Sequence, residues 1–127
     1  VALVDHHVKL ARLPVALDGM TIVQITDVHV SSIIGRDFVE HLVERINQLK
    51  PDVVAITGDL VDGSVAQLGA HVAPLAGLRS RHGTFFVTGN HEYYSGAHAW
   101  IEALRPPHCT SGIESARLRR CASRRSR

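Results

Sequence analysis

Three short polar motifs in this 127-residue chain carry side chains that can bind metal ions. They are Asp27-Val28-His29, Gly58-Asp59 and Gly89-Asn90-His91-Glu92. Carboxylate oxygens, imidazole nitrogens and an amide oxygen suit Mn, Fe, Zn and similar divalent cations. In the Asp-x-His motif the two ligands lie two residues apart, so an extended backbone points both to the same side. A carboxylate shared by two cations about 3.5–4 Å apart would suit a phosphoryl displacement.

Each motif directly follows a short apolar run that predicts a strand. The runs occupy residues 21–26, 53–57 and 84–88. Their near-continuous apolar character predicts strands covered on both faces, as in a parallel sheet. Open α/β sheets bind ligands at the carboxyl ends of their strands, so we expect five side chains to cluster at that edge. They are Asp27, His29, Asp59, Asn90 and His91.

Helical patterns alternate with these apolar runs. Residues 37–50 place apolar side chains at spacings of three and four. An N-cap at Ser64 begins a second pattern, inside which Pro74 predicts a kink or a break. A third pattern starts near Ser95, and residues 1–13 are a candidate edge strand. The order β-α-β-α-β-α predicts an α/β fold with a mostly parallel sheet.

The composition is that of an ordinary globular domain, with 45% apolar and 20% charged residues. No apolar run approaches the roughly 18–20 residues needed to span a bilayer. The net charge of +2 is unevenly distributed. Residues 1–104 hold seven Lys and Arg against eleven Asp and Glu, whereas residues 105–127 hold seven Arg against one Glu. The basic character therefore comes from the last 23 residues, and we predict no nucleic-acid partner.

The sequence changes character after Leu104. The remaining residues are rich in Arg and Ser and contain both cysteines. Such a segment buries too little apolar surface to offset the entropy of ordering. We therefore divide the chain into a domain of residues 1–104 and a basic tail of residues 105–127, without a further strand. The tail is interpreted as disordered or as translated out of frame, and a basic arm for nucleic acid or an anionic membrane is the alternative.

The three motifs resemble the first three signature blocks of the calcineurin-like metallophosphoesterase family. The resemblance spans about residues 15–104 and points above all to a bacterial branch that is often preceded by a membrane segment. It implies the N-terminal half of a β-sandwich flanked by helices. It also implies two divalent metal ions. Asp27 and His29 would bind the first ion, Asp59 would bridge both, Asn90 would bind the second, and His91 would be the catalytic histidine.

The resemblance implies hydrolysis of a phosphate-ester substrate by a metal-activated hydroxide at a dinuclear site. The substrate could be a phosphomonoester, a phosphodiester or a pyrophosphate. The family uses three further histidines, two of them in a Gly-His-x-His block, but only His98 and His108 follow His91 here. We therefore expect the chain as given to be truncated, weak or inactive, with one face of its sheet uncovered. A non-enzymatic fragment that keeps a partial metal site is the alternative.

The resemblance leaves localisation open. The whole protein would be either cytoplasmic or membrane-associated through a segment before Val1. Three other features receive structural interpretations from the sequence. Asp62-Gly63 is interpreted as a turn, Trp100 as a core residue and His71 as a solvent-facing side chain.

Overall fold

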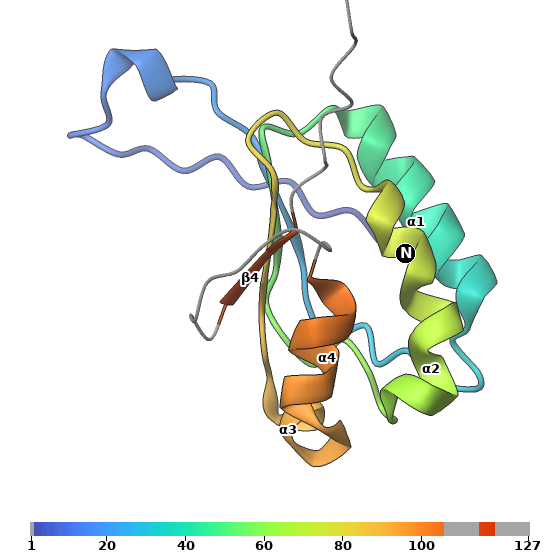
Figure 1. Ribbon diagram of the computed structural model, residues 1–127. Helices are drawn as coiled ribbons and strands as arrows, with labels where there is room; N and C mark the ends of the chain where they lie inside the picture. Colours follow the sequence, from blue (N-terminus) through green and yellow to red (C-terminus); the bar gives the residue numbers. More distant parts are fainter. Residues whose placement is uncertain (1, 106–114, 119–127) are drawn as a thin grey trace, which may run out of the picture.

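The computed structural model describes residues 2–105 and 115–118 (Figure 1). Its sheet has the spatial order β1-β2-β3-β4. The strands are β1 (Ile22–Ile25), β2 (Val53–Ile56), β3 (Thr84–Val87) and β4 (Ser115–Leu118). The first three strands are parallel, and β4 runs antiparallel to β3. This arrangement confirms the predicted α/β class with a mostly parallel sheet.

Four α-helices follow the strands along the chain. They are α1 (Arg36–Leu49), α2 (Val65–Val72), α3 (Asn90–Ser95) and α4 (Ala97–Leu104). Ser64 caps α2 through a reciprocal capping box with Gln67, as its residue type predicts. The helix gives way at Ala73–Gly77 to a 3₁₀ turn that contains Pro74, which confirms the predicted break.

The third helical region differs from its prediction. It begins at Asn90 rather than near Ser95, and Gly96 divides it into α3 and α4. Gly96 adopts a left-handed conformation with φ of 96°, which ends one helix and redirects the chain into the next. The polar motif after β3 is therefore the first turn of a helix instead of a loop.

The hydrophobic core lies between the helices and one face of the sheet. Phe86 from β3 and Trp100 from α4 have no exposed surface, and Val39 of α1 has almost none. Figure 1 shows α1 and α2 side by side on the same side of the strands. Burying each large apolar side chain contributes about 1.5–3 kcal/mol to the free energy of unfolding. This single core fixes the three parallel strands beneath the helices.

The other face of the sheet is only partly covered. Ile22 is 61% exposed, Val87 41% and Phe85 36%. The expectation that the strands are covered on both faces is therefore wrong for the described residues, and the expected uncovered face is observed. An apolar run indicates which residues can be buried, but it does not indicate whether helices or another sheet cover both faces of the strand.

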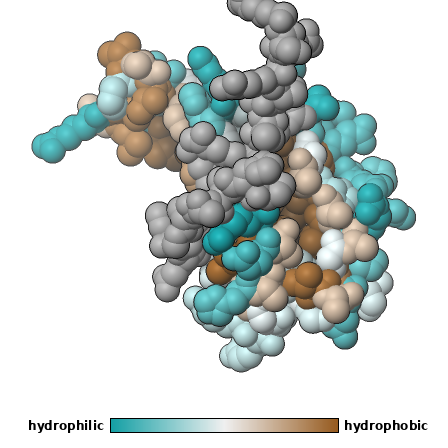
Figure 2. Space-filling model, viewed as in Figure 1, coloured by the Kyte–Doolittle hydropathy of each residue, from teal (hydrophilic) through white to brown (hydrophobic). Residues whose placement is uncertain are grey.

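Two segments differ from the sequence-based expectations. Residues 2–13 are exposed and form no strand, so the candidate edge strand is wrong. Figure 2 shows apolar side chains gathered near the 3₁₀ turn at Val15–Leu17, where Val15 is 91% exposed. In the tail, Ser115–Leu118 forms β4, which corrects the expectation that no further strand occurs there. A strand on a sheet edge pairs through its backbone, so it needs no apolar pattern.

The predicted disorder of the rest of the tail concerns residues 106–114 and 119–127, which lie outside the described residues. Within the part of the chain that the structure describes, no helix combines the length and the apolar composition required to cross a bilayer.

Candidate metal centre

The loops after β1 and β2 remain hydrogen-bonded to each other beyond the ends of the strands. The Asp27 N–H donates to the Gly58 carbonyl at 3.2 Å, and the His29 N–H donates to the Asp59 carbonyl at 3.1 Å. The Val30 N–H continues the series toward Leu60 at 2.8 Å. This ladder brings the first motif alongside the second, as the parallel order of the strands predicts.

Two glycines bring the loop after β2 against the start of α3. A Cβ atom on Gly58 would lie 2.7 Å from the Gly89 Cα. A Cβ atom on Gly89 would lie 2.5 Å from Asp59 Oδ1. Both distances are shorter than side chains tolerate, so only glycine permits this approach. The His91 N–H then donates to Asp59 Oδ1 at 2.9 Å, which joins the second and third motifs.

Three residues of these motifs have left-handed backbones. Asp27 has φ of 53°, His29 of 52° and Asp59 of 49°. A residue other than glycine in this region costs of order 1–3 kcal/mol, and such residues gather at functional sites. Three of the four such residues that the structure describes lie at this edge of the sheet, which makes the edge a candidate functional site. The spacing of apolar residues in the sequence does not predict these left-handed conformations.

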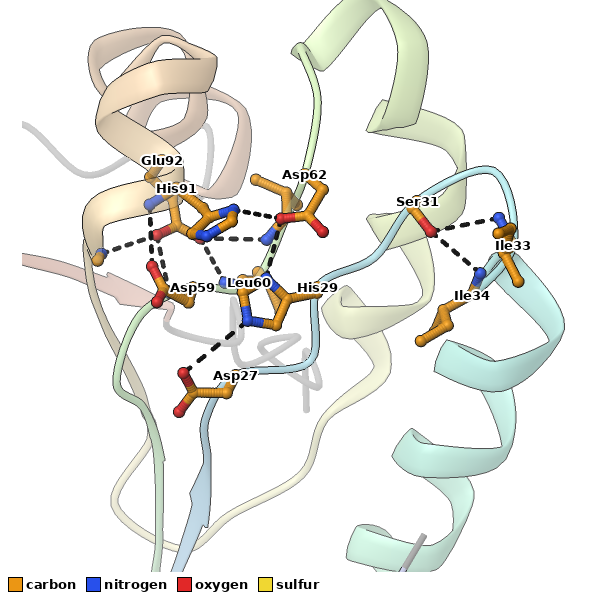
Figure 3. Close-up of polar contacts among 12 residues, drawn as sticks. Asp27, His29, Ser31, Ile33, Ile34, Asp59, Leu60, Asp62, His91 and Glu92 are labelled. Atoms are coloured by element: carbon orange, nitrogen blue, oxygen red, sulfur yellow. Dashed lines mark hydrogen bonds and ion pairs between the residues drawn. The ribbon is translucent and has the colours of Figure 1, made fainter.

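The side chains of Asp27, His29 and Asp59 converge (Figure 3). One ligand atom from each lies within 4.8 Å of the other two. The expected proximity of the Asp27 and Asp59 carboxylates is therefore confirmed. Bonds from oxygen or nitrogen to a divalent cation are about 2.0–2.2 Å long, so small side-chain movements would let all three donors reach one cation. The donor set fits a divalent cation of the Mn, Fe or Zn type.

Asp62 also belongs to this cluster, although the sequence analysis interpreted Asp62-Gly63 as a turn. Its Oδ1 lies 2.5 Å from His91 Nδ1 and 2.9 Å from His29 Nδ1. The two imidazole rings meet edge to face, with centroids 4.5 Å apart. His29, Asp62 and His91 thus form a second group with three potential ligands. The signal in the sequence was a second carboxylate three residues after Asp59, in the same loop.

Hydrogen bonds and charges within the cluster raise the pKa of His29 and lower the pKa of Asp62. The hydrogen bond to Asp62 raises the pKa of His29; partial burial opposes it, and the nearby carboxylates add to the rise. Partial burial of Asp62 works against its ionisation, but hydrogen bonds and charges from His29 and His91 outweigh it and lower its pKa. Because a metal-binding imidazole must be neutral, cation affinity at His29 should increase with pH.

The third motif supplies the remaining predicted residues. Asn90 is the first residue of α3 and is exposed, and His91 follows it with its side chain 45% exposed. The structure therefore brings His91 to Asp59 and Asp62, and it places Asn90 next to His91 in the chain. The roles of these residues as metal ligands or as a catalytic group remain predictions.

Comparison with known proteins agrees with this geometry. A family model for calcineurin-like phosphoesterases matches residues 20–118. The match includes all three motifs and continues through β4, beyond the boundary predicted at residue 104.

Several relatives resemble the chain over most of its length. A transmembrane protein with metallophosphoesterase domain from Danio rerio is 37% identical over 113 residues, which cover 88% of this chain and 25% of the relative. An uncharacterized metallophosphoesterase from Helicobacter pylori is 46% identical over 92 residues, or 69% of this chain and 25% of the relative. The Bos taurus transmembrane protein with metallophosphoesterase domain is 45% identical over 104 residues, 81% of this chain and 23% of the relative. The chain thus spans about a quarter of the length of these relatives, and no solved structure matches it significantly.

Proposed function

The chain belongs to the calcineurin-like phosphoesterase family, which is a family of metal-dependent enzymes, and from this premise we propose that the clustered strand ends hydrolyse phosphate esters. One observation carries the proposal. Ligand atoms of Asp27, His29 and Asp59 lie within 4.8 Å of one another, beside a histidine paired with a carboxylate. This combination offers both a place for a cation and a proton donor at the same edge of the sheet.

The proposed ligand roles follow from the positions of the residues. Asp27, His29 and Asp59 would hold one divalent cation, and Asp59 together with Asn90 would hold a second. When bound, such cations neutralise the negative charge that develops during phosphoryl transfer and clamp the attacking and leaving oxygens. Before a cation binds, Asp62 lies against both His29 and His91.

His91 is the residue that we propose to move a proton. Its Nδ1 is 2.5 Å from Asp62 Oδ1, so this nitrogen carries the proton that the carboxylate accepts. The ring is thereby oriented, and Nε2 is the atom that would donate a proton to the leaving-group oxygen. Its N–H bond to Asp59 fixes the backbone of the same residue beside the proposed bridging ligand.

The number of donors suggests how active the chain is. Among the described residues, three ligands converge on the first position, whereas Asp59 and Asn90 are the two that we assign to the second. We therefore propose that the first cation binds more tightly than the second and that the chain as given turns over slowly. A non-enzymatic chain with a partial metal site is the alternative that the same donor count favours.

A metal titration followed by a turnover assay tests these proposals. We expect the 127-residue chain to bind Mn²⁺, measured by electron paramagnetic resonance, and Asp59→Ala to lose that binding. Hydrolysis of bis-(4-nitrophenyl) phosphate should stay near background. Binding that is unchanged in Asp59→Ala would refute the metal site. Robust, EDTA-sensitive hydrolysis that disappears in Asp59→Ala would refute the low turnover and the non-enzymatic alternative.

We also propose that the whole protein acts at a membrane. The support comes from the names of the Danio rerio and Bos taurus relatives, which describe those proteins as transmembrane. Fractionation of cells that express the full-length gene tests this proposal, because a membrane protein stays with the membrane pellet after a high-salt wash.

A further inference from the structure

Glu92 is a fully buried carboxylate that the proposed reaction does not use. It follows His91 in α3, and the hydrogen bonds that it accepts from the described residues all come from backbone N–H groups (Figure 3). Its Oε2 accepts from Gly89 at 2.7 Å and from Asp59 at 2.9 Å. Its Oε1 accepts from Leu60 and, at 3.2 Å, from Val61. Four donors therefore surround one buried side chain.

The four contacts require a carboxylate. An ionised glutamate only accepts hydrogen bonds, so each of its oxygens can face two N–H donors. A buried charge is unfavourable unless it is hydrogen-bonded, and this one is bonded at both oxygens. The glutamine of the same shape would turn an NH₂ group toward two N–H donors. Both oxygens are also occupied and shielded from solvent, so Glu92 is not itself a metal ligand.

The contacts do more than cap a helix. Capping of α3 accounts for the bond to Gly89 alone, in which Glu92 at the third helical position accepts the N–H of the N-cap residue. The other three bonds cross from α3 to the loop after β2, at Asp59, Leu60 and Val61. They hold the segment in which Asp59 adopts its left-handed backbone, close to the carboxylate of Asp27.

We infer that Glu92 is a positioning residue that sets the spacing between Asp59 and His91 before any cation binds. This inference rests on the proposed function, because its consequence is the affinity of the cation site. Without Glu92, repulsion between the Asp27 and Asp59 carboxylates and the left-handed strain would displace Asp59. The cation would then have to reorder the loop as it binds.

Mn²⁺ affinity and amide hydrogen exchange of the 127-residue chain test the inference. In Glu92→Gln we expect Mn²⁺ affinity to fall about 10–100-fold, the range seen when groups that support metal ligands are changed. Without metal, exchange at Asp59, Leu60 and Val61 should accelerate, while exchange in α1 should stay as in the wild type. Glu92→Asp keeps the charge, so we expect it to recover part of both effects.

Val39→Ala is the matched control, because Val39 is almost as buried as Glu92 but belongs to α1 rather than to α3 or the loop after β2. It should destabilise the fold and leave Mn²⁺ affinity within about twofold, since cavity costs are local. Equal losses of affinity in Glu92→Gln and Val39→Ala would overturn the inference, as would wild-type exchange at Asp59–Val61 in Glu92→Gln.

A wild-type chain that binds no Mn²⁺ would refute the proposed function, and the exchange measurement would still decide the role of Glu92. If Glu92→Gln does not fold, Glu92→Asp must show an intermediate loss, and wild-type behaviour of that variant would reject the inference.

Discussion

The carboxylates at the two ends of the parallel strands have opposite surroundings: the one at the amino end is hydrogen-bonded, and those at the carboxyl end lie close to each other. At the amino end, Asp52 accepts a hydrogen bond from the Thr21 N–H at 2.8 Å, and its own N–H donates back to the Thr21 carbonyl at 3.0 Å. The backbone N–H of His82 donates to the Asp52 carbonyl at 2.7 Å, which joins the segment before β3 to the same residue. At the carboxyl end, ligand atoms of Asp27 and Asp59 lie within 4.8 Å of each other, in left-handed backbones.

We interpret the amino end as a stabilising contact and the carboxyl end as the proposed cation site. The polar groups of Asp52 and Thr21 at the amino end face partners of opposite character, so this pair is stable without any ligand. The carboxyl end keeps strain and like charges together, an arrangement that persists only where the surrounding structure enforces it. Substitutions at the amino end should therefore affect stability alone, whereas neutralising a clustered carboxylate at the carboxyl end should change affinity and stability in opposite directions.

The largest expected effect is that of Asp59→Asn at the carboxyl end. Asparagine keeps the shape, tolerates the left-handed backbone and can still accept the bond from His91, but it removes one negative charge. We expect Mn²⁺ affinity to fall at least about 100-fold, more than the loss typical of groups that only support a ligand. In EDTA the free energy of unfolding should stay equal or rise, because repulsion with Asp27 is relieved. A titration and urea unfolding in EDTA measure both quantities, and a loss of stability in EDTA would contradict the comparison.

Trp100→Phe should have the next largest effect. Trp100 is fully buried in α4, and its indole N–H donates to the Gly63 carbonyl at 2.9 Å, directly after Asp62. Phenylalanine leaves that carbonyl without the donor and leaves part of the volume empty, so the free energy of unfolding should fall by about 1–3 kcal/mol. Urea unfolding in EDTA checks this value.

Trp100→Phe also tests whether a residue that only supports the loop, and binds no cation itself, affects Mn²⁺ affinity. If Trp100 holds the Asp62–Gly63 bend, Mn²⁺ affinity should also fall in Trp100→Phe, though less than in Asp59→Asn. Ile101→Val changes a neighbouring, partly buried residue of α4 and serves as the control. An equal change of Mn²⁺ affinity in both variants would show that the bend does not depend on Trp100.

The sequence predicted the placement of the site because two simple signals agree. Apolar runs identify β1, β2 and β3, and a parallel order forces their carboxyl ends to one edge of the sheet. Asp27 and Asp59 could therefore be brought together without any knowledge of side-chain geometry. The helix start at Ser64 could also be predicted from the sequence, because its capping box depends on two residues only three positions apart.

Contacts between distant segments could not be predicted in the same way. Asp62 resembles a turn residue until the loop after β3 brings His91 to it, 29 positions along the chain. The burial of Glu92 leaves no local signal in the sequence, because three of its four N–H donors lie 31 to 33 positions earlier in the chain. β4 forms on the edge of β3 through backbone bonds, which leave no apolar pattern in the sequence.

His71→Ala should have a smaller effect, and this residue, which the sequence analysis interpreted as solvent-facing, is half-buried against the start of α1. Gly35 provides no side-chain cap for α1, and His71 Nδ1 of α2 instead accepts the Arg36 N–H at 3.0 Å. Loss of a helix cap costs about 0.5–2 kcal/mol, so we expect that fall in the free energy of unfolding, with unchanged Mn²⁺ affinity. His98→Ala in α4 alters an exposed histidine and should change stability by less than about 0.5 kcal/mol. Equal effects of the two substitutions would show that His71 is not a cap.

The smallest expected effect belongs to Asp52→Asn at the amino end, and its pH dependence identifies its cause. The backbone N–H of Thr21 lowers the pKa of Asp52; a small desolvation opposes this, and the Thr21 hydroxyl adds to it. A carboxyl with a lowered pKa in the folded state stabilises the fold above its unfolded value of about 3.9, and that stabilisation disappears as pH falls through the folded value. The wild type should therefore exceed Asp52→Asn in urea midpoint at pH 7, and the difference should shrink as the solution is acidified below about pH 3.9.

Thr21→Val tests which of the two Thr21 donors produces this pH dependence. Valine removes the hydroxyl, which is 3.3 Å from Asp52 Oδ2, and keeps the backbone N–H at 2.8 Å. Because the backbone donor has the larger effect on the pKa, most of the difference between aspartate and asparagine at position 52 should survive in the Thr21→Val background. A difference that vanishes with the hydroxyl would assign the interaction to the side chain. A difference that is the same at every pH would mean that the charge of Asp52 does not contribute, and the contrast between the two ends of the sheet would then rest on backbone geometry alone.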